Sequence, residues 1–238
     1  SQKAFEVCDF KINLEYCSIT FEQNFLNTQI RPGSKNTELP ASFENYMIES
    51  VAKKSNSLLE TVFWVGDTGT ATYPNSLCDG LIKKLNADAL TGSMSATSST
   101  ISSTNIIGEM NRIYNAIPVA VRSGNAQSDV VFFLSSDMFV AYVQAQATAQ
   151  AGQGYNYSDA QKMFFLGHPV VEAPGIGTKK AVVSAKDNLL ILTDLMDDKS
   201  EVRIIPQYDK SGAPTTRVVA RMKFSPDFHI ASEIVYYK

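Results

Sequence analysis

The sequence contains few of the residues on which most enzymes and cross-linked domains depend. Its 238 residues include only two histidines and three cysteines. The cysteines, Cys8, Cys17 and Cys78, match neither the even set of a disulfide framework nor the paired spacing of a zinc site. We therefore expect free, partly buried thiols in a reducing compartment.

Long hydrophobic runs and a signal peptide are also absent from the sequence. A helix that spans a membrane needs about 20 consecutive apolar residues, and no stretch of the chain approaches that length. We therefore expect no membrane partner. The first residue is Ser1 and not methionine, which fits a processed or trimmed N-terminus.

Positive charge is sparse and scattered. The formal net charge is −3, and the clusters of lysine and arginine never exceed pairs such as Lys53 and Lys54. A protein that reads DNA or RNA sequence usually carries a basic face, so selective recognition is not expected. Non-specific contact with packaged nucleic acid stays open. Apolar residues make up 44% of the chain, which is typical of a globular protein with a core.

The N-terminal part combines a strand with an apolar loop. Phe10, Ile12, Leu14 and Tyr16 alternate with polar residues, and this period of two predicts a half-buried strand. Between residues 19 and 38, apolar side chains stand among Asn, Gln and Thr. This composition predicts an extended loop with exposed apolar groups, which usually mark a surface for a partner.

A long helix is expected to follow the loop. Pro40 stands where a helix tolerates proline best, and apolar residues recur at helical spacing from there to residues 64–67. The helix would have about 20 residues and a length of about 30 Å.

The middle of the chain predicts alternating helices and strands. The expected segments are a short helix at residues 78–85, a Ser/Thr-rich loop at 91–104, a helix at 106–117, a buried strand at 130–134 and a helix from 139. Short strands are expected at residues 170–171, 181–184 and 188–193.

The last third predicts strands separated by turns at residues 209–212 and 225–227. With the first strand and the long helix, these strands would form one layered α+β unit. Residues 68–199 would then be a second subdomain inserted into the first.

No motif in the chain predicts catalysis, cofactor binding or a metal site. His168 and His229 stand alone, and Ser50 with Lys53 matches an acyl-enzyme S-x-x-K pattern without its companion motifs. Residues 175–180 are rich in glycine and lysine but do not match a phosphate-binding loop, so a turn between strands is expected. Asp197 and Asp198 are expected in a charged loop. We therefore expect a protein that is not an enzyme, with no cofactor.

Several segments, taken in order, resemble the major capsid proteins of tailed phages, the shell subunits with the Hong Kong 97 fold. The segments that carry the resemblance are residues 39–67, 79–82 with 105–118, 131–142, 165–174, 186–194 and 217–237. The resemblance implies an α+β fold with a long spine helix, a peripheral β-sheet domain and an inserted axial α/β domain.

The resemblance also implies a layout of domains. Residues 1–17 would be an N-terminal arm and first strand, and residues 18–38 an extended loop that lies over a neighbouring subunit. Residues 39–67 and 200–238 would form the peripheral domain, and residues 68–199 the axial domain. The expected inter-subunit contacts are Phe21, Phe25, Leu26, Ile30 and Arg31.

The function implied is self-assembly into pentamers and hexamers of an icosahedral shell that encloses double-stranded DNA. The partners would be further copies of the chain, portal, scaffold or decoration proteins, and packaged DNA bound without sequence preference. The location would be the virion capsid, assembled in the host cytoplasm. Three alternatives stay open: the shell of an encapsulin-type bacterial nanocompartment, a hydrolase with an unrecognised triad, and a tail or neck component.

Covalent cross-linking between subunits is not expected. Some proteins of the resembled family join a lysine of the extended loop to an asparagine late in the chain. Lys35 is the only lysine between Lys11 and Lys53, but no asparagine follows Asn188. A denaturing gel of mature particles should therefore show single chains, and a ladder of covalent oligomers would contradict this prediction.

Overall fold

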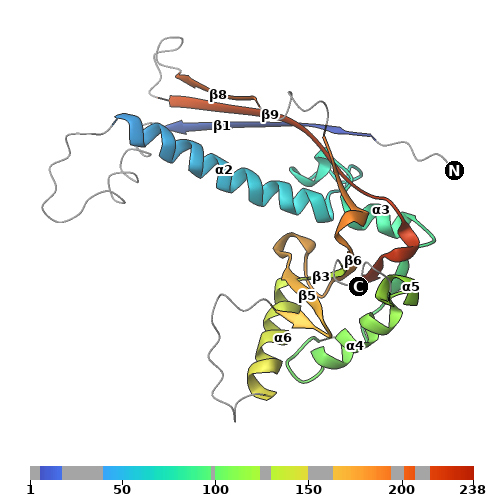
Figure 1. Cartoon of the computed structure of the whole chain (residues 1–238). Coiled ribbons are helices and arrows are strands. Elements are labelled where there is room, and N and C mark those ends of the chain that lie inside the picture. Colours follow the sequence, from blue (N-terminus) through green and yellow to red (C-terminus); the bar gives the residue numbers. More distant parts are fainter. Residues whose placement is uncertain are drawn as a thin grey trace, which may run out of the picture. The chain divides into compact units, whose positions relative to one another are not determined.

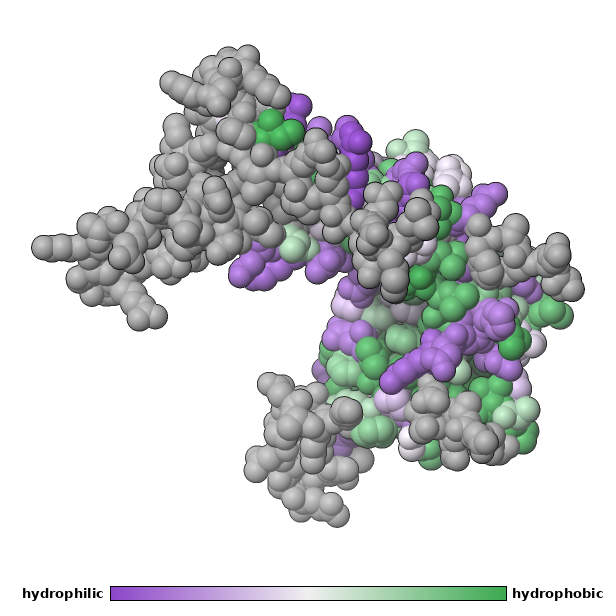
Figure 2. All heavy atoms as spheres, turned by 45° about the horizontal axis from the view of Figure 1, so that its top comes forward, coloured by the Kyte–Doolittle hydropathy of each residue, from purple (hydrophilic) through white to green (hydrophobic). Residues whose placement is uncertain are grey.

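The computed structural model describes residues 6–17, 40–97, 100–123, 130–149, 163–193, 201–206 and 215–238. The chain divides into two compact units. Unit 1 comprises Ser1–Leu59 and Leu192–Phe224, and unit 2 comprises Glu60–Ile191 and Ser225–Lys238. Figure 1 traces the elements of both units, and Figure 2 shows that hydrophobic residues reach the surface of the described part.

The described strands of unit 1 belong to a four-stranded sheet. Strand β1 (Cys8–Cys17) is antiparallel to β9 (Thr215–Phe228), and β9 is also antiparallel to β8 (Glu201–Pro206). In this sheet β7 (Leu189–Leu192) also pairs with β9. In β1, Phe10 is buried while Lys11, Asn13 and Glu15 are exposed, so the predicted alternation of this strand is confirmed where it is described. The ring of Phe10 packs edge-on against Phe224 at a centroid distance of 5.6 Å.

The long helix α2 runs from Pro40 to Val65 and has 26 residues, so it begins at the predicted proline and is longer than expected. Proline is tolerated at the start of a helix because its missing N–H has no partner to lose there. The last turns of α2 belong to unit 2, where Val62 and Trp64 are buried.

Unit 2 is built on a six-stranded sheet in the order β2-β10-β6-β3-β5-β4. The strands are β2 (Gly92–Met94), β3 (Val130–Leu134), β4 (Phe164–Phe165), β5 (His168–Glu172), β6 (Ala181–Ala185) and β10 (Val235–Tyr237). Strand β3 is parallel to β5 and antiparallel to β6. Strand β10 lies between β6, to which it is antiparallel, and β2, to which it is parallel.

The remaining elements of unit 2 are helices and one further strand. They are η1 (Asn75–Leu77), α3 (Leu81–Ala87), α4 (Ile106–Ala116), α5 (Val119–Ser123), α6 (Ser136–Ala149), η3 (Pro174–Ile176), η4 (Lys186–Asn188), β7 (Leu189–Leu192) and η6 (Ala231–Glu233). The predicted helix from residue 106 and the predicted buried strand at 130–134 are confirmed.

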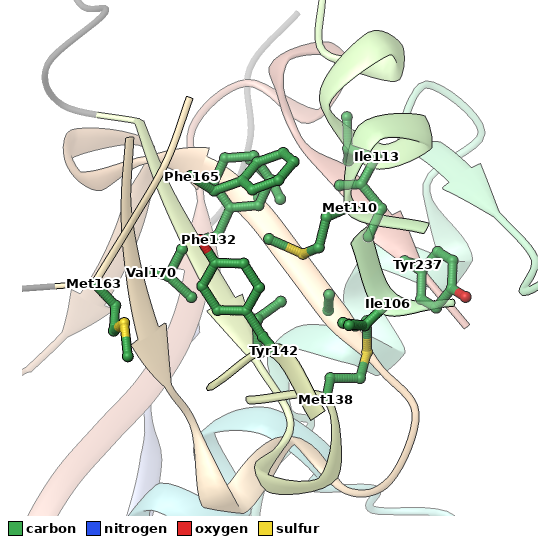
Figure 3. Close-up of a cluster of buried hydrophobic side chains, with 14 of the residues drawn as sticks. Ile106, Met110, Ile113, Phe132, Met138, Tyr142, Met163, Phe165, Val170 and Tyr237 are labelled. Atoms are coloured by element: carbon green, nitrogen blue, oxygen red, sulfur yellow. The ribbon is translucent and has the colours of Figure 1, made fainter. Parts of the chain in front are cut away.

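One face of the sheet packs against α4 and α6 (Figure 1). The first core of unit 2 lies there. From the strands it takes Phe132, Val183 and Tyr237, and all three are buried. From the helices it takes Ile106, Met110, Ile113, Met138 and Tyr142. Figure 3 shows the side chains of Phe132 and Tyr237 gathered in one cluster with those of the two helices. Burial of this apolar surface is what holds the two helices on the sheet.

The second core of unit 2 lies on the opposite face. Successive residues of a strand point to opposite faces, so Val182 and Tyr236 enter this core while their neighbours enter the first. Trp64 of α2 and Leu81 and Leu85 of α3 complete it, and Phe133 of β3 packs at its side. Both faces of the central strands are therefore covered.

The end of the chain differs from its prediction. The expected turn at residues 225–227 is wrong, because β9 continues as a strand to Phe228. The final strand joins the sheet of unit 2 and not that of unit 1, because Tyr236 and Tyr237 are buried in its two cores. The two compact units divide at residues 59/60, 191/192 and 224/225. The Ser/Thr-rich stretch also differs, since it contains β2.

Replacing Tyr236 with alanine should destabilise unit 2 by about 3–5 kcal/mol, because the change leaves a cavity in the second core. Urea unfolding followed by the fluorescence of Trp64 measures this, since Trp64 is the only tryptophan and lies in the same core. Ser232→Ala, at an exposed position of the same segment, is the control and should change stability by less than about 0.5 kcal/mol. Equal curves for both variants would contradict the packing described.

Candidate interaction surfaces and polar clusters

The two histidines lie in different settings. His168 of β5 is fully buried, with its ring between Tyr114 and Phe132 at centroid distances of 5.8 and 6.1 Å. Within the described part of the chain, neither of its ring nitrogens has a hydrogen-bond partner. His229 is exposed, and its backbone N–H donates to Asn188. Among the described residues, no group of three or more His, Cys, Asp or Glu is placed to hold a metal ion.

The S-x-x-K pattern falls inside α2. Ser50 and Lys53 both belong to this helix, and Lys53 is exposed. No described contact joins Lys53 to a second catalytic group. The predicted position of both residues in the long helix is therefore confirmed, and the pattern adds no chemistry to the described structure.

The glycine-rich segment at residues 175–180 is a connection between β5 and β6, as predicted. The N–H of Gly175 donates to Oε1 of Glu60 at 3.2 Å. A Cβ atom on Gly175 would lie 2.7 Å from the backbone oxygen of Glu60, which is closer than side-chain atoms approach. The glycine is needed for this close approach to α2. The N–H of Lys179 is also used, because it donates to Asp137.

Two of the cysteines are not the free thiols that the sequence predicts. Cys8 and Cys78 are both disulfide-bonded, so the expectation of free thiols is wrong for these two residues. A disulfide requires a particular separation and orientation of the two residues, and the tertiary fold decides which cysteines meet this requirement. Sequence spacing alone did not contain that information.

Lys83 forms ion pairs with two carboxylates near the end of α2. Its Nζ atom lies 2.6 Å from Oδ1 of Asp67 and 2.7 Å from Oδ1 of Asp79. Hydrogen bonds from Lys83 and the Gly69 N–H lower the pKa of Asp67. Burial would raise the pKa of Asp79, but hydrogen bonds from Lys83 and Thr68 outweigh it and lower that pKa. The cluster joins the end of α2 to α3, and its carboxylates are occupied by the ammonium group.

A second polar cluster surrounds Glu109 of α4, which is almost fully buried. Its Oε2 atom accepts hydrogen bonds from Tyr237 at 2.9 Å and from Arg112 at 2.6 Å, and Oε1 accepts one from the Thr97 N–H. Burial would raise the pKa of Glu109, but these bonds outweigh it and lower the pKa. Burial, followed by the bond to Glu109, raises the pKa of Tyr237. The cluster attaches α4 to the C-terminal strand.

The residues predicted to contact a neighbouring subunit lie outside the described part of the chain. Phe21, Phe25, Leu26, Ile30 and Arg31 all fall in residues 18–39, and Asp197 and Asp198 likewise lie outside it. Their roles stay predictions. Among the described residues, no helix is both long and apolar enough to cross a membrane.

Sequence reasoning missed an apolar surface that the structure describes. Phe164, Leu166 and Val171 of the β4–β5 hairpin are each between 43% and 55% exposed. Scattered exposed apolar residues are ordinary, but three on one short hairpin form a patch. The dipeptide Leu166-Gly167 between two apolar runs was the available signal, since a glycine at that place is typical of a tight hairpin turn.

Comparison with known proteins gives matches only at the level of structure. No protein-family model matches the sequence, and no curated protein matches it either. Solved structures do match, over nearly the whole chain and at low sequence identity.

Three of these structures illustrate the likeness. A chain of the satellite phage P4 procapsid matches with a TM-score of 0.61 and 14% identity, over 100% of this chain and 77% of that one. A chain of the capsid of the native GTA particle matches with a TM-score of 0.53 and 13% identity, over 98% and 72%. The SrpI encapsulin of Synechococcus elongatus matches with a TM-score of 0.53 and 9% identity, over 98% and 73%. The chain therefore has the fold of phage capsid proteins, a fold that the encapsulin also has.

Replacing Glu109 with glutamine should change how the stability of unit 2 depends on pH. Above the ordinary glutamate pKa of 4.5, the bonded carboxylate contributes its full stabilisation, which is lost as the pH falls below 4.5 through the lowered pKa. The variant should be less stable at neutral pH by about 1.5–3 kcal/mol, and this difference should shrink in acid. Urea unfolding of both proteins, repeated from neutral pH into the acid range, measures it.

The matched control is Glu172→Gln, which alters an exposed carboxylate of β5. This variant should keep the stability and the pH profile of the unmodified protein. A constant difference between Glu109→Gln and the unmodified protein across the acid range would show that the carboxylate charge of Glu109 does not stabilise unit 2.

Proposed function

We propose that this chain is the major capsid protein of a tailed phage, with the Hong Kong 97 fold. Many copies assemble as pentamers and hexamers into an icosahedral shell that encloses double-stranded DNA. The observation that supports this proposal best is the likeness to the satellite phage P4 procapsid, because it extends over the whole length of this chain. A likeness confined to one unit would support only a shared domain.

The elements of the fold have distinct roles in this proposal. Helix α2 is the spine helix, residues 39–67 and 200–238 form the peripheral domain, and residues 68–199 form the axial domain. Residues 1–17 are the N-terminal arm and first strand. Residues 18–38, with Phe21, Phe25, Leu26, Ile30 and Arg31, form the extended loop that contacts a neighbouring subunit.

A structural role without catalysis agrees with how the described polar groups are used. Lys83 with its two aspartates, Glu109 with its donors, and Gly175 all make contacts that hold elements together. The partners in this proposal are copies of the chain, portal, scaffold or decoration proteins, and packaged DNA held without sequence preference. The protein resides in the virion capsid and assembles in the host cytoplasm.

A second candidate function is the shell of an encapsulin-type nanocompartment. The match to the SrpI encapsulin supports it, at a TM-score equal to that of the GTA capsid chain. The two functions share self-assembly and differ in what the shell encloses. The fold therefore supports the shell, and the content distinguishes the candidates.

The chain, expressed and purified from bacteria, should form closed particles that negative-stain electron microscopy detects. Particles isolated from the native source should contain double-stranded DNA that resists nuclease until the shell is opened. A protein cargo without DNA would favour the nanocompartment instead. A chain that stays monomeric at all concentrations, or forms only rings or tubes, would contradict both shell functions.

A further inference from the structure

The hairpin between β4 and β5 turns through two residues with an unusual backbone. Leu166 has a φ angle of 48° and Gly167 one of 88°, so both are in the left-handed region. Two successive residues with positive φ define the type I′ turn, which favours Asn, Asp or Gly at its first position. A leucine there is disfavoured by contact between its Cβ atom and the backbone. Leu166 nevertheless presents a side chain that is 55% exposed.

The register of the hairpin places Phe164, Pro169 and Val171 on one face of the sheet. Phe164 is paired with Pro169, and Val171 is paired with Phe133 of β3, which packs on the second core of unit 2. Paired residues share a face, and so do residues two apart in a strand. Phe164, Pro169 and Val171 therefore continue the apolar face of Phe133 toward the edge strand β4.

This continuation is exposed among the described residues of unit 2. The opposite face of the same hairpin carries Phe165 and Val170, which are buried in the first core. Phe164 and Val171 are 50% and 43% exposed. We define Phe164, Leu166 and Val171 as the hairpin patch.

The lack of positive charge around the hairpin patch favours a protein partner over nucleic acid. Residues 163–172 contain one charged side chain, Glu172, and no lysine or arginine. Binding to nucleic acid depends on lysine and arginine contacts with phosphate, so packaged DNA is a poor occupant. An uncharged, aromatic and aliphatic surface suits a protein surface of the same kind.

The small area of the hairpin patch also indicates which kind of partner it binds. A stable complex of two separate proteins buries about 1,200–2,000 Å² in total, which is far more than three side chains supply. A small apolar contact becomes effective when it is one of several that recur around every subunit of an assembly. In a ring, such a contact joins the patch to a different surface of the next copy.

We infer that the hairpin patch is a contact surface for a second copy of this chain. The inference rests on the proposed shell function, which supplies neighbouring copies around each subunit. It explains why an exposed leucine occupies a turn position that asparagine would fit better. The side chain of Leu166 is buried only in the assembly, while the turn that presents it is strained in the single chain.

The turn offers a variant that separates folding from assembly. Leu166→Asn should keep or raise the unfolding temperature of the subunit, because asparagine tolerates the left-handed conformation. It should weaken each subunit contact by about tenfold, equivalent to about 1.4 kcal/mol. The critical concentration for assembly, measured as the free subunit that coexists with particles, should therefore rise by at least about tenfold.

A second variant and a control complete the experiment. Val171→Thr keeps a β-branched residue in the strand and should also raise the critical concentration. Leu90→Asn makes the same replacement at a leucine that is 71% exposed and outside the patch, and it should leave assembly unchanged.

The outcomes are distinguishable. An unmodified chain that forms no particles would overturn the proposed shell function. If the unmodified chain assembles and the patch variants assemble at the same concentration, the shell function stands and the assignment of the patch is wrong. Equal losses of assembly in Leu90→Asn and Leu166→Asn would also overturn it, because the effect would not belong to the patch.

Discussion

The insertion of the C-terminal strand into the sheet of unit 2 is the constraint on which that unit depends most. Strand β10 lies between β2 and β6, so the sheet is interrupted until the last residues of the chain arrive. Tyr236 is buried in one core and Tyr237 in the other, and the hydroxyl of Tyr237 donates to Glu109 of α4. One short strand therefore completes two cores and satisfies a buried carboxylate. Its removal would leave backbone groups of β2 and β6 without partners and would take from Glu109 one of its three hydrogen-bond donors.

The described part of the chain contains no catalytic arrangement of residues. The sheet of unit 2 shows how the protein can act through its surface instead. Its central strands are covered on both faces, while its β4–β5 edge is covered on one. The polar groups that first suggest chemistry serve packing, as Gly175 does against α2 and Lys83 does between two aspartates. The surface is therefore the part of the described structure that is available for interaction, and one of its exposed apolar residues, Leu166, lies on a strained turn. Strain of this kind is often kept where a residue meets a partner.

The elements with strong local patterns could be predicted from the sequence. The alternation around Phe10, the proline that starts α2 and the apolar run at residues 130–134 each depend on neighbouring residues alone, and the structure confirms them. The partner of the last strand could not be predicted. The apolar residues of β10 could pack in either sheet. Which sheet β10 joins depends on contacts with residues far away in the chain, such as Glu109. The disulfide bonding of Cys8 and Cys78 was missed for the same reason.

The candidate sites show the same difference between what local sequence patterns predict and what only the tertiary structure decides. Sequence patterns by themselves determined the mixed α+β class, the long helix, and the absence of a recognisable catalytic or metal-binding motif, because composition and local periodicity carry this information. Only the tertiary structure decided that Phe164, Leu166 and Val171 are exposed while Phe165 and Val170 are buried. The five residues look alike in the sequence. Which of them meets solvent depends on the face of the sheet that the helices cover, and that is a property of the whole fold.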